Sequence, residues 1–254
     1  MSKKAILVDI TKCIGCGACQ VACKAKNGLP EGEEKKLSST AYTTIEEKDG
    51  IYVRHLCMHC ENPTCASVCP VGAIEKTSAG AVVYDAEKCM GCRYCMQACP
   101  FQVPRYEWNH ATPKMQKCNL CHDRIAEGLA PACVEACPTG ASTFGDRNEI
   151  LREARRRVEE NPNDYVHYIF GESEVGGTSV FYLSAVSFGS LGFKTDLSKE
   201  PLPLRTWEAL SKIPKVVFVG GVLLYGIWWI TNRREEVRKL EAKLKEMEDE
   251  EEIN

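Results

Sequence analysis

The sequence predicts an α+β fold in which two cysteine-rich units are followed by a single C-terminal transmembrane helix. Three observations support this prediction. All sixteen cysteines lie between Cys13 and Cys137, short apolar strand patterns lie among and after them, and residues 216–231 carry no charge. With 44% hydrophobic and 26% charged residues among 254, the chain is neither disordered nor collagen-like. Its net charge of −3 gives no electrostatic basis for nucleic-acid binding.

The amino-terminal residues predict a strand rather than an export signal. A secretory signal needs an apolar stretch of about seven or more residues, but Asp9 interrupts the apolar run at residues 5–8. No twin-arginine pair precedes the first cysteine. We therefore expect residues 5–9 to form a strand that leads into the first cysteine group. Any export from the cytoplasm would depend on a partner that carries a signal.

The cysteines form four groups of four. Groups one and three have the spacing C-x2-C-x2-C-x3-C, which is typical of cubane iron–sulfur ligation. A proline follows the last cysteine of groups two, three and four, whereas Lys24 takes that place in group one. The groups are, in order, Cys13, Cys16, Cys19 and Cys23; Cys57, Cys60, Cys65 and Cys69; Cys89, Cys92, Cys95 and Cys99; and Cys118, Cys121, Cys133 and Cys137.

This spacing has a geometric reason. Three closely spaced thiolates on a tight loop can each reach a different iron of one cube, and the fourth reaches the neighbouring cube. We expect the fourth cysteine to open a short helix that points away, with the following proline helping to turn the chain. Gly15, Gly17 and Gly91 would let the loop backbone approach the cube and aim its N–H groups at the sulfurs. Lys24 is expected to alter the turn but not the ligation.

Disulfides and zinc are the competing explanations for the cysteines. Triplets of cysteines two residues apart are poorly placed to form four bridges per group. Zinc prefers two separated C-x2-C knuckles per tetrahedral site, a pattern that group four alone could match. Four [4Fe–4S] clusters are therefore the prediction, and a zinc-stabilised structural scaffold of a membrane complex is the alternative.

Residues 57–100 resemble a two-cluster bacterial ferredoxin, with a strand at residues 80–85 between the two cysteine groups. In such ferredoxins the last cysteine of each group ligates the other cluster. We therefore expect this inner unit to hold one cube with Cys57, Cys60, Cys65 and Cys99, and its neighbour with Cys69, Cys89, Cys92 and Cys95. By symmetry, an outer unit of residues 1–56 with 101–145 would use Cys13, Cys16, Cys19 and Cys137 for a third cube, and Cys23, Cys118, Cys121 and Cys133 for a fourth.

The order of the four groups, with the C-x2-C-x11-C-x3-C-P spacing of group four, resembles the four-cluster subunits of membrane oxidoreductases. These include the iron–sulfur (beta) subunits of respiratory formate dehydrogenase and of dimethyl sulfoxide reductase, and the ferredoxin-like subunit of a membrane hydrogenase. Residues 168–172 and 176–183 resemble the segment after the clusters in the formate dehydrogenase and hydrogenase branches. Cys92 stands where nitrate reductase relatives carry a tryptophan and bind a three-iron cluster.

The resemblance implies a non-catalytic subunit that relays single electrons through four clusters. Its partners would be a catalytic oxidoreductase subunit of the molybdenum, tungsten or nickel–iron type, and an integral membrane cytochrome b or quinone-reactive subunit. The sequence contains no dinucleotide fingerprint, phosphate loop or nucleophile elbow. A self-sufficient ferredoxin-type enzyme with an organic cofactor is the second alternative. The five histidines are expected to lie at the surface or next to the cluster ligands without binding iron; they are His55, His59, His110, His122 and His167.

The segment at residues 146–212 is expected to lead from the clusters to the membrane. Asp146 is a suitable N-cap for a helix that ends at Glu160, with Glu149 three residues after the cap. The helix would bury one stripe of side chains, formed by Ile150, Leu151, Ala154 and Val158. Residues 178–183 are predicted to form a short buried strand.

Residues 213–232 are the predicted membrane anchor, because about twenty apolar residues are needed to cross the hydrocarbon layer. Tyr225, Trp228 and Trp229 would lie in an interfacial aromatic belt. The anchor contains no histidine, so it cannot hold a bis-histidine haem. More lysines and arginines follow the anchor than precede it, which predicts a cytoplasmic tail and a periplasmic cluster unit. The tail, residues 233–254, is predicted to be a charged helix with apolar positions at Val237, Leu240, Leu244 and Met247.

Overall fold

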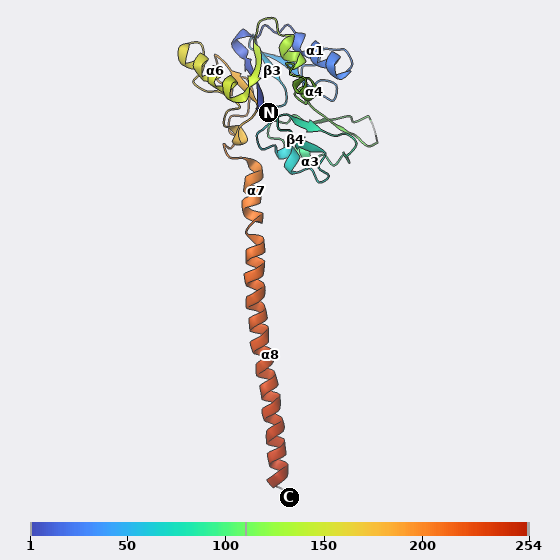
Figure 1. The fold of residues 1–254 in the computed structure, drawn as a ribbon, viewed down its shortest axis with the longest axis vertical. Coiled ribbons are helices and arrows are strands. Elements are labelled where there is room, and N and C mark those ends of the chain that lie inside the picture. The colour runs from blue at the N-terminus through green and yellow to red at the C-terminus, as the bar shows by residue number, and fades with distance from the viewer. Residues whose placement is uncertain (1, 110, 253–254) are drawn as a thin grey trace. The chain divides into compact units, whose positions relative to one another are not determined.

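The computed structural model describes residues 2–109 and 111–252 and divides the chain into two compact units, Met1–Pro203 and Leu204–Asn254 (Figure 1). The first unit contains all four cysteine groups among short helices and strands, as expected for an α+β fold. Its elements are β1 (Lys4–Asp9), η1 (Ile10–Lys12), α1 (Ala18–Asn27), β2 (Thr44–Lys48), β3 (Ile51–His55), α2 (Thr64–Ser67), β4 (Ile74–Lys76), β5 (Val82–Tyr84), α3 (Tyr94–Ala98), β6 (Arg105–Tyr106), β7 (Met115–Gln116), α4 (His122–Ala126), α5 (Ala132–Glu135), β8 (Ser142–Asp146), α6 (Arg147–Glu160), η2 (Glu174–Gly176) and β9 (Val180–Leu183).

A three-stranded sheet with the order β8–β1–β9 organises the first unit. Strand β1 pairs antiparallel with β8 and parallel with β9, so that Val8 lies opposite both Ser142 and Tyr182. The predicted strand at residues 5–9 is thus confirmed as the central strand. It leads through η1 to Cys13, while β8 begins shortly after Cys137. The sheet therefore brings the beginning of group one close to the end of group four.

Both faces of strand β1 are buried, because successive side chains of a strand point to opposite faces. One face packs against helix α6, and the other joins the core that also contains Cys57 and Cys118. Ala5 and Leu7 lie on the α6 side, whereas Ile6 and Val8 lie on the cysteine side. Strand β1 therefore packs against helix α6 on one face and against the cysteine-containing core on the other.

The segment after the cysteines forms the predicted helix and strand. Asp146 caps α6 by accepting a hydrogen bond from the Asn148 N–H at 3.1 Å. Ile150, Ala154 and Val158 of the predicted stripe are buried, and all four residues of β9 are buried. These elements hold the segment against β1 through apolar packing.

The helices beside the cysteines differ from the sequence prediction. The short helices α2, α3 and α5 each contain the third cysteine of a group, and the fourth cysteine follows the helix instead of opening it. The reason is the proline after that cysteine, because a residue that precedes proline is disfavoured in helical conformation. Lys24 replaces proline in group one, and there α1 runs through Cys23 to Asn27. The expected change of the turn at Lys24 is thus present.

Three two-stranded hairpins complete the first unit: β2–β3, β4–β5 and β6–β7. The β2–β3 hairpin was not predicted, although its sequence signal is clear. Asp49 and Gly50 both have positive φ, as a two-residue type I′ turn requires, and Asp-Gly is a preferred pair in such turns. This hairpin places Arg54 of β3 in the interior, where it is 2% exposed.

The described residues of the second unit are helical except for a turn at residues 211–212. After α7 (Leu202–Leu210), the long helix α8 (Ile213–Glu252) contains both the predicted anchor and most of the predicted tail (Figure 1). Within the described residues, one stretch, Leu202–Lys245, is long and apolar enough to cross a membrane, with a mean hydropathy of 1.7 in its most apolar window. Large apolar side chains such as Phe218 and Leu224 are exposed along it. This stretch is the candidate transmembrane helix of the predicted fold class.

The close approach of Gly171 to strand β9 makes a first prediction. A Cβ at Gly171 (φ 98°) would lie 2.3 Å from the Val180 carbonyl oxygen. We expect Gly171→Ala to lower the unfolding free energy by about 3 kcal/mol and the midpoint by roughly 6–12 °C, measured by circular dichroism. Gly50→Ala is the control, because Gly50 also has positive φ but a Cβ there meets no described atom within 4 Å. Equal effects of the two substitutions would contradict the proposed clash.

Candidate iron–sulfur centres

Four thiols of groups one and four line a common cavity in the first unit. The cavity is formed by the loop before α1, the segment between α5 and β8, and the start of β8. Arg54, Thr139 and Ser142 also line it. Its cysteines are Cys13, Cys16, Cys19 and Cys137, three from group one and the last from group four.

A second cavity gathers thiols of groups two and three in the same way. Its lining includes Tyr84, Tyr106 and Met115, which come from the β4–β5 and β6–β7 hairpins. Its cysteines are Cys69, Cys89, Cys92 and Cys95, the last of group two and three from group three. Both cavities thus contain the combination of three cysteines and one exchanged cysteine that the sequence predicts.

The other eight cysteines are more deeply placed, and their mutual influence indicates which of them are neighbours. Burial raises the pKa of the Cys60 thiol well above its ordinary value, and Cys57, Cys99 and Cys65 add to the rise. Burial likewise raises the pKa of Cys23 to about 12, with contributions from Cys133 and Cys121. Burial also raises the pKa of the Cys118 thiol, and the charges of Cys23, Cys57 and Cys133 add to that rise.

All sixteen cysteines are free thiols, and backbone N–H groups are directed at several of their sulfurs. The Ala73 N–H lies 3.2 Å from Cys69 Sγ, and the Leu120 N–H lies 3.3 Å from Cys118 Sγ. Gly15 and Gly91, both with positive φ, direct their N–H groups to Cys13 and Cys89. Such donors stabilise thiolate charge, so the residues fit a thiolate-bound cluster.

The thiols fit cubes better than single metal ions. In a zinc site all ligands lie about 2.3 Å from one ion. Within residues 2–109 and 111–252, no three His, Cys, Asp or Glu side chains converge tightly enough to hold a metal ion. Each four-cysteine cavity instead surrounds a space, as ligands of a multi-iron cube must do. The geometry offers no support for the zinc alternative.

Two polar side chains are buried among the cysteines: Arg54, which sequence reasoning did not anticipate, and His59, which it expected at the surface or next to the ligands. Arg54 donates from Nε to Thr43 Oγ1 at 3.0 Å and from Nη1 to Ser142 Oγ at 2.8 Å. His59 is fully buried and accepts the Val82 N–H on Nδ1 at 2.9 Å, and burial lowers its pKa well below the ordinary value. A position beside Cys60 was the available signal for His59, whereas Arg54 is brought to the thiols only by the β2–β3 hairpin.

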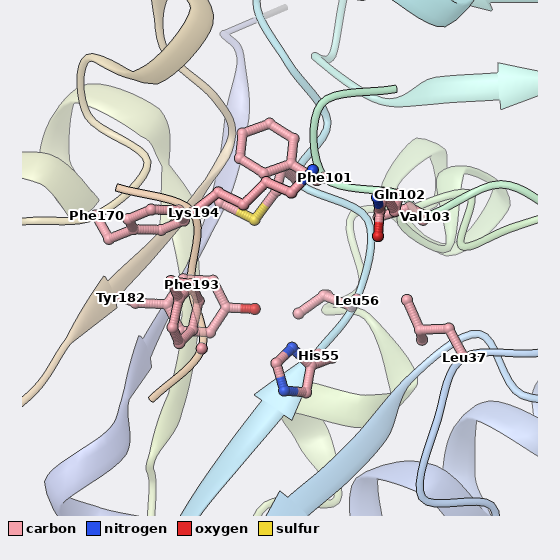
Figure 2. A pocket seen from close by; sticks show the side chains of 12 residues that line it. Leu37, His55, Leu56, Phe101, Gln102, Val103, Phe170, Tyr182, Phe193 and Lys194 are labelled. Atoms are coloured by element: carbon pink, nitrogen blue, oxygen red, sulfur yellow. The ribbon is translucent and has the colours of Figure 1, made fainter. Parts of the chain in front are cut away.

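A separate cavity of about 140 Å³ lies beside the group-two loop and is lined mainly by apolar and aromatic side chains (Figure 2). The ring of Phe193 packs against Phe170 and Tyr182, with centroids 4.7 Å and 5.1 Å apart. Met58 and Phe101 lie in the same lining, next in the chain to the Cys57 and Cys99 loops. The cavity therefore contributes an apolar surrounding to these loops but contains no thiol ligand.

Family comparisons agree with this thiol geometry. Residues 48–147 and residues 12–73 each match a family model described as a 4Fe-4S dicluster domain. Together these matches contain all four cysteine groups. The first unit therefore contains two dicluster domains of the ferredoxin type, as the resemblance of the sequence predicts.

Three named relatives from Escherichia coli identify the family. Hydrogenase-2 operon protein HybA is 36% identical over 233 residues, covering 73% of this chain and 71% of the relative. The iron–sulfur subunit of nitrate-inducible formate dehydrogenase is 38% identical over 197 residues, covering 70% and 66%. A polypeptide of anaerobic dimethyl sulfoxide reductase is 39% identical over 155 residues, covering 58% and 75%. The protein belongs to this family of iron–sulfur electron-transfer subunits, which leaves the zinc scaffold without support.

The Tyr106 hydroxyl provides a second prediction, because it lies 3.2 Å from Cys95 Sγ. Hydrogen bonds to cluster sulfur raise the reduction potential. We expect Tyr106→Phe to lower one cluster potential by roughly 40 mV, which is about 1 kcal/mol for a one-electron couple. A redox titration followed by electron paramagnetic resonance measures this. Tyr165→Phe, whose hydroxyl instead contacts Asp9 Oδ2 at 2.9 Å, should leave every potential unchanged. A shift of every cluster potential in Tyr106→Phe would contradict the local assignment.

Proposed function

We propose that the sixteen cysteines hold four [4Fe–4S] clusters that relay single electrons between a catalytic subunit and a membrane subunit. When bound, each cluster supplies the capacity to accept and release one electron. The chain's own residues hold the clusters at fixed positions and surround them with hydrogen-bond donors and apolar side chains. The single observation that carries the proposal is that thiols from different groups meet in two four-cysteine cavities.

The ligand sets follow the exchange of fourth cysteines between groups. The two cavities support the sets that contain Cys137 and Cys69 as exchanged ligands. The electrostatic neighbours of Cys60 and Cys23 support the other two sets. The proposed sets are Cys13, Cys16, Cys19 and Cys137; Cys23, Cys118, Cys121 and Cys133; Cys57, Cys60, Cys65 and Cys99; and Cys69, Cys89, Cys92 and Cys95. Residues 1–56 with 101–145 and residues 57–100 would then be the outer and inner units.

Electrostatic influences between thiols of different sets support a linear order of the four clusters. Cys19 of the first set is influenced by Cys133 of the second, and Cys118 of the second by Cys57 of the third. Cys65 of the third set is in turn influenced by Cys95 of the fourth. Each set therefore has a neighbour in the next set, which is the arrangement that stepwise electron transfer requires.

The two terminal sets are the proposed points of electron exchange with partners. Cys16 of the first set is exposed, and Ile14 beside it is 60% exposed. In the fourth set, Met90 lies between Cys89 and Cys92 and is 64% exposed. Apolar side chains at the surface beside a redox centre can be covered by a partner subunit.

The partners proposed for the chain follow from its relatives. A relative is named as the iron–sulfur subunit of formate dehydrogenase and another as a hydrogenase operon protein. We therefore propose a catalytic partner of the molybdenum or tungsten formate dehydrogenase type, or of the nickel–iron hydrogenase type, with formate dehydrogenase favoured. This chain would be non-catalytic, because its thiols serve as cluster ligands.

The proposed membrane partner is a cytochrome b or another quinone-reactive subunit. Helix α8 would anchor this chain through residues 213–232, which contain no histidine to hold a haem. Electrons must then leave for another subunit. Six lysines and arginines follow the uncharged stretch at residues 216–231 and three closely precede it, which supports a cytoplasmic tail and a periplasmic cluster unit. The six are Arg233, Arg234, Arg238, Lys239, Lys243 and Lys245, and the three are Arg205, Lys212 and Lys215.

The first experiment measures metals per copy of this chain in the complex, purified in detergent without oxygen. We expect at least sixteen irons, from the four four-iron clusters of this chain. Molybdenum or tungsten in the complex would indicate a formate dehydrogenase-type partner, and nickel would indicate a hydrogenase. Zinc in place of iron would overturn the proposed function.

A third prediction tests the exchange of Cys137. We expect Cys137→Ser and Cys13→Ser to alter the same electron paramagnetic resonance signal, because both residues would ligate one cluster. Cys118→Ser is the matched variant and should alter a different signal. All three variants should lose quinone-linked turnover but retain dye-linked activity of the catalytic partner. An effect of Cys137→Ser on the Cys118 signal would place the cysteine in its own group instead.

A fourth prediction concerns the anchor. A chain that ends at Pro203, the end of the first compact unit, should leave the membrane fraction, because it lacks the apolar stretch. A chain that ends at Arg234 keeps the anchor without the tail and should remain in the membrane fraction. Fractionation followed by immunoblotting measures both. Membrane binding by the Pro203-terminated chain, expressed without its partner subunits, would contradict the proposed role of α8.

A further inference from the structure

Arg54 is a buried cation with no matching anion in its surroundings. Its exposed fraction is 2%, and an arginine side chain keeps its charge at all pH values that proteins experience. No carboxylate among the described residues forms an ion pair with it, and its two hydrogen bonds go to the neutral hydroxyls of Thr43 and Ser142. A buried charge without a counter-ion is strongly unfavourable.

One arm of the guanidinium has no oxygen or nitrogen acceptor. Nε and Nη1 are occupied by the two hydroxyls, which fix the plane of the group. Nη2 is buried and donates to no oxygen or nitrogen of the described residues, so this arm is available to the Cys133 thiol. Arg54 also lines the cavity formed by the first cysteine set. The Arg54 side chain is thus held rigidly, and its Nη2 can donate to the neighbouring thiols.

Arg54 acts on cysteines of the first and second proposed sets, which together form the proposed outer unit. Although burial opposes its charged form, the charges of Cys133, Cys19 and Tyr182 and a hydrogen bond with Cys133 together raise the pKa of Arg54. In return, Arg54 counteracts the burial-driven rise in the pKa of Cys13, Cys19 and Cys23. Cys13 and Cys19 belong to the first proposed set, and Cys23 and Cys133 belong to the second.

We propose that Arg54 is the shared counter-charge of the two outer clusters and raises the reduction potentials of both. The inference rests on the proposed function, since it requires those clusters to be bound. A cube held by four thiolates is anionic and gains one further negative charge on reduction. A fixed cation at low dielectric favours the more negative state. One electron passes from one outer cluster to the other, and Arg54 neither gains nor loses a proton.

Other buried cations do not combine these properties. Lys76 forms an ion pair with Glu61 at 3.0 Å, which neutralises its charge locally. Lys117 donates to the carbonyl oxygens of Val82 and Cys118, and its charge acts on Cys65, which belongs to the third proposed set. Arg54 is permanently charged and acts on thiols of two sets at once.

The test compares Arg54→Gln with Arg54→Lys in the purified complex, after iron analysis, by redox titration with electron paramagnetic resonance. Gln keeps N–H donors and loses the charge, whereas Lys keeps the charge. Lys12→Gln is the control, because Lys12 precedes Cys13 but its side chain is 46% exposed and screened by water. We expect two of the four potentials to fall in Arg54→Gln. All four should stay near the native values in Arg54→Lys and in the control.

Each outcome decides the proposal. Unchanged potentials in a fully loaded Arg54→Gln complex, or equal shifts with Gln and Lys, would overturn the counter-charge. If Arg54→Gln fails to load the outer clusters while Arg54→Lys loads them with native potentials, the requirement for the charge is supported by loading itself. Failure of both variants to load would make Arg54 a folding residue and overturn the proposal. An iron content well below sixteen in the native complex would instead count against the proposed function.

Discussion

The antiparallel pairing of β1 with β8 is the constraint on which the outer cysteines depend. Val8 lies opposite Ser142, so the chain entering group one and the chain leaving group four run side by side although 134 positions separate them. Cys13 and Cys137 then line one cavity. Burial of β1 on both faces makes this register strict, because a slip of one residue would exchange its two sets of side chains between faces. The parallel partner β9 closes the other edge of β1 and brings the segment after the cysteines into the same core.

Local backbone chemistry then determines how each thiol is presented. Proline after the fourth cysteine ends α2, α3 and α5 early, which leaves the following backbone free to fold back over the sulfur. Cys137 illustrates the result: although burial opposes it, N–H groups of Ser142, Thr139 and Ala141 and the Thr139 hydroxyl lower its thiol pKa. Group one has no such proline, and Cys23 instead lies in the middle of α1. Its sulfur receives a side-chain donor, Asn27 Nδ2, at 3.6 Å.

Sequence patterns predicted the parts of this protein that depend on neighbours in the chain. The cysteine spacing, the strand at β1, the Asp146-capped helix and the apolar stretch of α8 are all local signals, and each is present in the structure. The position of the fourth cysteine relative to its helix was predicted wrongly, because the conformational preference of the residue before proline was not applied. Arg54 could not be anticipated, since its burial results from a hairpin that packs against residues far away in sequence. The outer exchange of cysteines was reached only by symmetry, because spacing within a group carries no information about long-range pairing.

The cysteines of the proposed sets are more buried in the middle of the series than at its two ends. This difference explains how one chain can shield electrons from water and still exchange them with partners. Cys118 and Cys57 connect the two middle sets and are both buried, so that charge there is surrounded by protein rather than water. In such a medium an added electron costs more free energy unless a cation or a donor offsets it. At the two ends, Cys16 is exposed and Cys92 is partly exposed, and solvent or a partner can supply that compensation. The interior sets therefore depend on the protein's own groups, and the buried charge of Arg54 acts on Cys23 and Cys133 of one of them, the second set.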